Sequence, residues 1–217
     1  KGMRENGYTA AFADRCFKQI EGFGEYGFPE SHAFSFALLA YVSSWLKCHY
    51  PATFACALLN SQPMGFYAPA QLVTDARQHN VEVRPVDVSH SQWDCTLEKN
   101  EQNNAALRLG FRTVAGLSEE ITDRIIHVRD QRSYDSFDDF KQRVRLGAAN
   151  LSRLSRADAF RSINLSRRPA LWESLPDQSR QPLFENLNET DTPATLPRMS
   201  EFSQIIADYR ATGMSLK

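Results

Sequence analysis

The sequence predicts a mainly α-helical fold with a small β element (α+β), and two observations carry this prediction. Apolar residues recur at helical spacing through most of the chain, whereas residues 81–109 contain short apolar runs typical of strands. The 217 residues are 42% hydrophobic and 24% charged, which is typical of a soluble globular protein. This length suffices for one large domain or two small ones with a buried core.

The first part of the chain is expected to be helical. Helical spacing predicts helices over residues 10–23, 31–50, 52–59 and 68–79. Ser31 can cap the second of these helices, and Pro51 ends it and suits the first turn of the next. Apolar residues lie nearly all round helix 31–50, so this helix is expected to be buried on most faces.

The second part begins with β structure. Three short strands are expected, at residues 81–86, 93–97 and 105–109. Helical spacing then returns and predicts a helix after Ser118 and further helices at residues 137–144, 151–160, 168–175 and 199–212. Four prolines between residues 176 and 197 are typical of a linker.

Positive charge is concentrated in one segment. The net charge of −1 excludes a uniformly basic nucleic-acid coat protein, but residues 141–168 carry eight basic side chains against one acidic. The basic residues are Lys141, Arg143, Arg145, Arg153, Arg156, Arg161, Arg167 and Arg168. This asymmetry indicates either an anionic partner or a solvated, arginine-rich helical surface.

Residues 113–126 (TVAGLSEEITDRII) show the pattern of a helix–hairpin–helix element. Gly116 can adopt a backbone conformation that residues with a side chain avoid, and Ser118 can cap the following helix. The main-chain amides of such a hairpin can hold a DNA phosphate without reading bases. An ordinary helix start explains the first motif alone, but a second candidate at residues 159–172 favours binding to the DNA backbone.

Several kinds of catalytic and metal site are absent from the sequence. It has no phosphate-binding loop of the G-x-x-x-x-G-K-[ST] type, no G-x-S-x-G motif and no Asp-x-Asp pair for two metal ions. The four cysteines show no zinc-like spacing, which favours reduced structural thiols and a cytoplasmic location. No apolar run reaches the roughly 18 residues that a membrane span needs. We therefore expect no catalytic residue, no metal site and no membrane contact.

Five motifs resemble the bacterial C-family DNA polymerases, relatives of the replicase alpha subunit. In chain order they are residues 26–32 (YGFPESH), 45–52 (WLKCHYPA), 54–59 (FACALL), 84–88 (RPVDV) and 107–117 (LRLGFRTVAGL). The likeness is collinear over residues 5–175. Residues 29–42 and 60–67 are similar to the error-prone branch of the family, which acts in translesion synthesis and damage-induced mutagenesis.

The resemblance implies a domain organisation. It comprises a helical distal fingers subdomain (1–80), a small β-containing connection (81–112), a tandem helix–hairpin–helix region that binds duplex DNA (113–175), a linker (176–198) and a helix leading to an OB domain outside the sequence (199–217). The family's catalytic carboxylates and their Mg²⁺ belong to a palm upstream of Lys1. The segment is thus expected to be part of a DNA-directed DNA polymerase, inactive and without a cofactor by itself.

The expected site residues form two groups. The main chain of Gly116, Leu117 and Ser118 and the side chains of four arginines are expected to contact duplex phosphates; the arginines are Arg112, Arg161, Arg167 and Arg168. The position of His32 in the first helical turn favours a partly buried residue that helps to cap the helix. The resemblance instead places His32 and Phe36 at the pocket for the nascent base pair. Replicases usually carry tyrosine where Phe36 stands, so its missing hydroxyl predicts a pocket more tolerant of distorted pairs; its apolar setting also fits a core residue.

The expected partners are primer-template duplex DNA and accessory mutagenesis proteins. Some replicases carry a sliding-clamp peptide, Gln-x-x-(Leu/Met)-Phe, near the linker. Residues 180–184 (RQPLF) depart from it, since arginine stands first and Gln181 comes one residue late, ahead of Leu183 and Phe184. Recruitment through another protein is therefore preferred.

Three other functions remain open. The chain could be the same region of a high-fidelity replicase, a self-standing helix–hairpin–helix DNA-binding module, or a module whose arginine face meets an acidic protein. Phe36 and the motif at residues 29–42 argue against the first, and the nearly all-apolar helix argues against the second.

Overall fold

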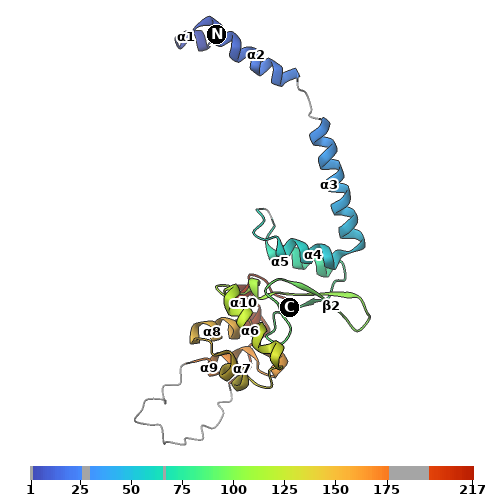
Figure 1. The fold of residues 1–217 in the computed structure, drawn as a ribbon, viewed down its shortest axis with the longest axis vertical. Coiled ribbons are helices and arrows are strands. Elements are labelled where there is room, and N and C mark those ends of the chain that lie inside the picture. The colour runs from blue at the N-terminus through green and yellow to red at the C-terminus, as the bar shows by residue number, and fades with distance from the viewer. Residues whose placement is uncertain (1, 26–29, 66, 176–195) are drawn as a thin grey trace, which may run out of the picture. The chain divides into compact units, whose positions relative to one another are not determined.

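The computed structural model describes residues 2–25, 30–65, 67–175 and 196–217, and the side chains of these residues except 22–25, 30 and 31. It is mainly helical with one small sheet, as predicted. The chain divides into two compact units, residues 1–49 and 50–217. Figure 1 shows the elements of both units along the chain.

In the first unit, the described residues form the helices α1 (Gly2–Glu5), α2 (Ala10–Glu25) and α3 (Glu30–His49). Helix α3 ends just before Pro51, as the missing amide of proline predicts. Its apolar side chains are exposed within this chain, although its sequence pattern predicts burial on most faces. These side chains include Phe34, Phe36, Leu38, Leu39, Tyr41, Val42, Trp45 and Leu46.

The second unit contains the sheet and the remaining helices. Helices α4 (Pro51–Asn60) and α5 (Pro69–Gln78) precede the strands β1 (Val83–Arg84), β2 (Thr96–Lys99) and β3 (Ala105–Arg108). After the strands come a short 3-10 helix η1 (Phe111–Thr113) and the helices α6 (Glu119–Gln131), α7 (Phe137–Val144) and α8 (Ala148–Arg156). They are followed by a second 3-10 helix η2 (Arg161–Ile163), α9 (Arg167–Glu173) and α10 (Glu201–Thr212). In Figure 1 the strands lie between the pair α4–α5 and the helices α6 to α9.

The sheet is smaller than the sequence predicts. Its strand order is β1-β3-β2, with β1 parallel and β2 antiparallel to β3. Strand β1 stops before Pro85, which lacks an amide for the ladder. Strand β2 begins at Thr96 because the segment before it turns: the carbonyls of Gln92 and Trp93 accept hydrogen bonds from the amides of Phe111 and Arg112 instead.

Local capping explains where two of the helices begin. The Ser136 hydroxyl accepts the Asp139 amide at the start of α7, and the Ser200 hydroxyl accepts the Ser203 amide at the start of α10. Helix α10 ends at Gly213, whose φ of 73° is the left-handed conformation that suits a helix end. The predicted helices at 137–144 and 199–212 are thus confirmed.

One hydrophobic core runs through the second unit. It extends from Ala52 on α4 to Met214 beyond α10, and its largest buried side chains include Phe111, Phe140 and Phe160. Phe160 meets Phe140 edge-on, with ring centroids 5.1 Å apart. Because α4 and α5 share this core, the compact unit begins at Tyr50, whereas the expected fingers segment extends to residue 80.

Helix α10 returns to the body after residues 176–195, which contain most of the expected linker and lie outside the described residues. The Ala115 amide donates to the Ala211 carbonyl at 2.8 Å, and the side chain of Met214 is buried. Among the residues in the four described ranges, none of the helices has the length and hydropathy needed to cross a membrane.

Candidate nucleic-acid interface

The first hairpin lies between η1 and α6. Gly116 has a φ of 76°, which confirms the prediction that this turn needs a left-handed residue. Ser118 occupies the N-cap position of α6 with an extended backbone, but its side chain makes no capping hydrogen bond. Its carbonyl instead accepts from the amide and hydroxyl of Thr122, each at 3.2 Å.

The amides of this hairpin differ in what they can offer a ligand. The Leu117 amide donates to the Val114 carbonyl at 3.2 Å, and the Leu117 side chain is buried in the core. No acceptor for the amides of Gly116 and Ser118 is found among the described residues. Of the three main-chain amides proposed for phosphate contact, these two can therefore still donate a hydrogen bond to a phosphate.

An arginine that sequence reasoning missed lies beside the first hairpin. A Cβ atom on Gly116 would stand 3.0 Å from Nε of Arg153, which comes from α8. Arg153 also donates to the Asn150 side chain at 2.6 Å. The basic segment 141–168 was the only sequence signal for it, and that segment contains seven other basic residues.

The second hairpin joins α8 to α9. Helix α8 ends at Arg156, four residues before the predicted end, because Asp158 adopts a left-handed conformation with φ of 60°. The short helix η2 follows, and Asn164 (φ 61°) leads into α9. The Ser162 hydroxyl donates to Oδ1 of Asp87 at 2.6 Å, which ties this hairpin to the segment after β1.

Two of the four arginines proposed for phosphate contact are bonded to other groups of the protein. Arg112 donates to the carbonyls of Asn60 (2.7 Å) and Gln62 (3.1 Å) and pairs with Asp94 (2.6 Å). Arg167 is 6% exposed, donates to the Gln204 carbonyl at 3.0 Å and pairs with Asp208. Both side chains thus have structural partners that their local sequence does not show.

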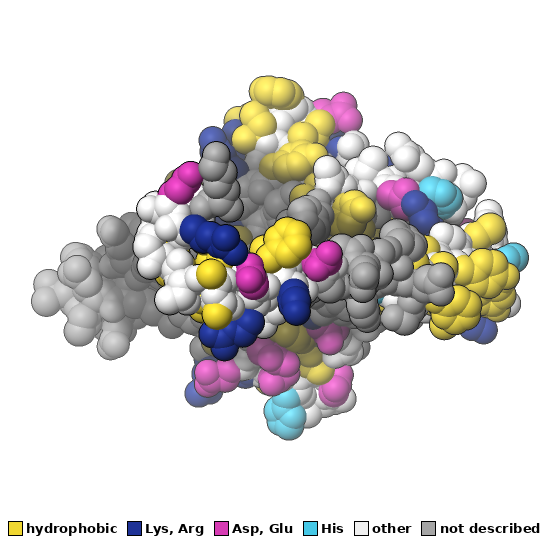
Figure 2. Space-filling view, turned by 90° about the horizontal axis from the view of Figure 1, so that it is seen from above, with side chains coloured by type: hydrophobic (Ala, Val, Ile, Leu, Met, Phe, Trp, Pro, Cys, Tyr) yellow, Lys and Arg dark blue, Asp and Glu magenta, His cyan; other side chains and the backbone are white. Residues whose placement is uncertain are grey.

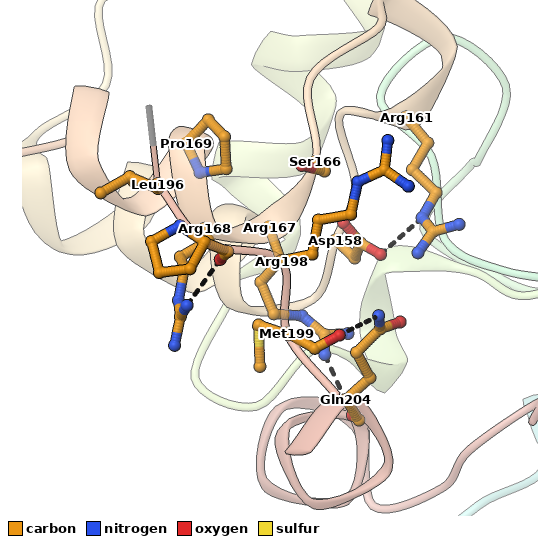
Figure 3. Close-up of a pocket in the computed structure, with 11 residues that line it drawn as sticks. Asp158, Arg161, Ser166, Arg167, Arg168, Pro169, Leu196, Arg198, Met199 and Gln204 are labelled. Atoms are coloured by element: carbon orange, nitrogen blue, oxygen red, sulfur yellow. Dashed lines mark hydrogen bonds and ion pairs between the residues drawn. The ribbon is translucent and has the colours of Figure 1, made fainter. Parts of the chain in front are cut away.

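The other two proposed arginines reach the surface. Arg161 is about half exposed and pairs with Asp158 at 2.5 Å. Arg168 is exposed and donates to the Pro197 carbonyl at 2.6 Å. Figure 3 shows that both lie around one pocket, together with residues of α9 and of the segment before α10.

The basic segment is not wholly a solvated face. Arg143 donates to the carbonyls of Val128 (2.7 Å) and Arg132 (2.6 Å), where α6 ends. Lys141 pairs with Asp138 at 2.8 Å. Figure 2 shows one face of the molecule, on which Lys and Arg side chains stand close to acidic ones. The positive charge available to a ligand is therefore smaller than the sequence count.

A third helix–turn–helix junction, which the sequence analysis did not single out, joins α7 to α8. Arg145 has a left-handed φ of 54°, and Gly147 is the N-cap residue of α8. The only local signal was Gly147 after a predicted helix end.

The residues proposed for the nascent base-pair pocket belong to the first unit. His32 and Phe36 are one helical turn apart on α3, their ring centroids are 4.5 Å apart, and both are exposed. The clamp-like residues Gln181, Leu183 and Phe184 lie outside the described residues.

Known proteins resemble both a part of this chain and its whole length. Residues 80–170 match the family model of a helix-hairpin-helix motif, which confirms that prediction. The chain is 51% identical over 216 residues to an error-prone DNA polymerase of Alkalilimnicola ehrlichii, 48% over 234 residues to one of Methylococcus capsulatus and 52% over 222 residues to one of Brucella abortus. These alignments cover all of this chain but 21%, 22% and 20% of the relatives, so the chain spans about a fifth of their length.

Proposed function

We propose that this chain is a segment of an error-prone DNA polymerase along its whole length, and that it grips primer-template duplex for such a polymerase. The grip acts on the phosphate backbone and is independent of base sequence. The matching motif of residues 80–170 and the relatives' names support this proposal.

The first hairpin is the observation that carries the proposal. It combines a left-handed Gly116, open amides at Gly116 and Ser118, and the start of the 13-residue helix α6. Amides at a helix start attract phosphate because they are unpaired and lie at the positive end of the helix dipole. Arg153 beside this turn adds a positive side chain.

In this proposal the catalytic chemistry of the whole enzyme takes place outside this segment. Nucleotidyl transfer would use two Mg²⁺ ions held by a palm outside this segment. The segment itself is inactive, and its contribution is to hold the duplex while error-prone, translesion synthesis proceeds in the cytoplasm with accessory mutagenesis proteins.

The grip is tested by binding the 217-residue chain to labelled primer-template duplex across a salt series. The variant Arg161→Ala/Arg168→Ala is compared with Arg15→Ala/Arg77→Ala, which removes two exposed arginines, one on α2 and one on α5. Wild-type affinity should fall linearly in log salt, and the first variant should lower this slope by about 0.9 for each phosphate that it no longer neutralises. The second variant should keep the wild-type slope.

One result would overturn the grip, and a second would move it away from the second hairpin. A folded chain that binds no duplex at low salt would favour the protein-interaction module with an acidic partner. Equal slopes for both variants would place the contact away from the second hairpin. Arg167 stays unchanged in this design because its loss would disturb folding as well as charge.

Phe36 bears on the choice between the error-prone branch and a high-fidelity replicase. The proposal assigns it, with His32, to the pocket around the nascent base pair, where the missing hydroxyl removes one polar restraint. Phe36→Tyr in the whole polymerase should then lower misincorporation and lesion bypass. Unchanged rates of both would mean that Phe36 is a packing residue only.

Recruitment through another protein, rather than through the sliding clamp, completes the proposal. A peptide of residues 177–188 should not bind the clamp. Binding that is abolished by Leu183→Ala/Phe184→Ala would reverse this assignment.

A further inference from the structure

A pocket of about 340 Å³ lies between the second hairpin, the start of α9 and the segment before α10. Four arginines line it, Arg161, Arg167, Arg168 and Arg198, against one acidic residue, Asp158. Figure 3 shows these side chains around the pocket, with Arg198 and Arg161 extending to the same side. Arg198 is the last residue of the expected linker (176–198) and was not among the proposed site residues.

Hydrogen bonds fix the segment that carries Arg198. Arg168 donates to the Pro197 carbonyl at 2.6 Å, and the Gln204 side chain donates to the Met199 carbonyl at 3.2 Å. The residues on either side of Arg198 are thus tied to α9 and to α10. Arg198 itself is exposed and has no ion-pair partner among the described residues.

Arg167 is a buried donor that the protein leaves partly unsatisfied. Its side chain is 7% exposed, and its terminal nitrogens bond Gln204 and Asp208. Its Nε has no hydrogen-bond partner among the described residues, and Oδ1 of Asp158 is also buried without one. An unsatisfied buried donor is costly, so a lining group of this kind indicates a missing acceptor.

The charge balance of the pocket selects the class of ligand. Oδ2 of Asp158 is already paired with Arg161, and Asp208 offsets Arg167, so two guanidinium groups remain unneutralised among the described lining residues. Arginine binds phosphate oxygens through planar, charge-assisted hydrogen bonds. A phosphate group supplies several acceptor oxygens for such donors and for the buried Nε.

We propose that this pocket binds a phosphate group, contributed by a DNA strand, and that Arg198 is a phosphate-binding residue within it. The DNA strand as the source of the phosphate rests on the proposed function. The pocket would then extend the second hairpin's contact by one phosphate, using the last residue of the expected linker.

The test uses the folded 217-residue chain with Arg198→Ala, and Arg210→Ala as the matched control on α10. In the salt series with duplex DNA, Arg198→Ala should lower the slope of log affinity against log salt by about 0.9, the value of one phosphate contact. Arg210→Ala should leave the slope at the wild-type value. A wild-type slope for Arg198→Ala would overturn the proposal.

A second experiment tests the phosphate site independently of the proposed duplex binding. Pyrophosphate is titrated into the chain while the NMR signal of the Arg167 Nε–H group is followed. If the chain binds no duplex, a saturable shift that Arg198→Ala abolishes would support a phosphate site that takes a free anion. Absence of any shift in a chain without duplex binding would overturn the site as well as the grip.

Discussion

At the scale of single residues, the sequence predicted correctly a conformation that depends on the backbone alone. Gly116 has the left-handed conformation that its motif predicts, because a turn of this shape excludes side chains whatever surrounds it. The roles of Arg112 and Arg167 were harder to predict. Their partners Asn60, Asp94 and Asp208 are 18 to 52 residues away in sequence, so only the fold reveals that these charges are occupied.

Gly116→Ala should lower the free energy of unfolding by about 1 kcal/mol, since alanine is strained at positive φ. The added Cβ would also displace Arg153, which should weaken duplex binding. Urea unfolding of the variant, with Gly65→Ala as control, measures the first effect. Gly65 lacks a left-handed φ and has open space around it, so equal losses of stability in both variants would contradict this account.

At the scale of elements, the helical spacing of apolar residues predicted most helices but not the connections between them. Helix α7 has the predicted bounds because Ser136 caps it and apolar residues recur at helical spacing within it. Strand β2 begins three residues later than predicted, because the Trp93 carbonyl accepts a hydrogen bond from the Arg112 amide and is not part of the sheet. The α7–α8 turn at Arg145 lacked a local pattern strong enough to predict it.

Arg143 stabilises the end of α6 through several hydrogen bonds that its planar guanidinium group donates. It donates to the carbonyls of Val128, Arg132 and Ser133 and pairs with Asp139. Arg143→Lys keeps the charge but cannot satisfy these acceptors together, so the free energy of unfolding should fall by about 2 kcal/mol. Urea unfolding measures this change. Arg145→Lys, at an exposed position, should change it little; a similar destabilisation in both would show that the fork is unimportant.

The sheet should be sensitive to acid through Glu98. Arg108 bonds both Glu98 oxygens, at 2.8 and 3.0 Å, and with Arg84 it lowers the pKa of Glu98 to about 2. A depressed carboxyl pKa stabilises the fold above the unfolded pKa of about 4.3, and this stabilisation is lost as pH falls toward 2.

Glu98→Gln should therefore make stability less dependent on pH between about 4.5 and 2. The difference between wild type and variant should shrink by about 2 kcal/mol over this range. Denaturant unfolding at pH 6 and pH 2.5 measures it, with Glu101→Gln in the neighbouring exposed turn as control. Parallel pH curves for wild type and Glu98→Gln would exclude this carboxyl as the cause.

At the scale of the whole molecule, the fold class and the helix-hairpin-helix motif were predictable from the sequence, whereas the proposed phosphate pocket was not. The pocket beside the second hairpin needs Arg198, which stands 30 residues after Arg168, at the end of the expected linker. Charge counting found the segment 141–168 but could not distinguish surface arginines from Arg143 and Arg167, which stabilise the fold.

Asp208 should be essential for attaching α10 to the hairpins. Asp208→Asn leaves the guanidinium of Arg167 buried without its counter-charge, which should cost about 3 kcal/mol of folding free energy. It also weakens the bond that Asp208 accepts from Ser215, at 2.7 Å. Urea unfolding measures the destabilisation, and Glu201→Gln, on the exposed first turn of α10, should be neutral. Near-wild-type stability of Asp208→Asn would mean that the pair contributes little.

The burial of Met214 has a consequence for how the protein is made. Its side chain completes a core whose other members begin at Ala52, so this core spans more than 160 residues of chain. During synthesis the hairpins can form early from local contacts, but they cannot close against α10 until its end has left the ribosome. The nascent polypeptide must therefore expose part of this hydrophobic core from the synthesis of α4 until residue 214 has left the ribosome, and a premature stop before residue 214 would leave that surface exposed to chaperones.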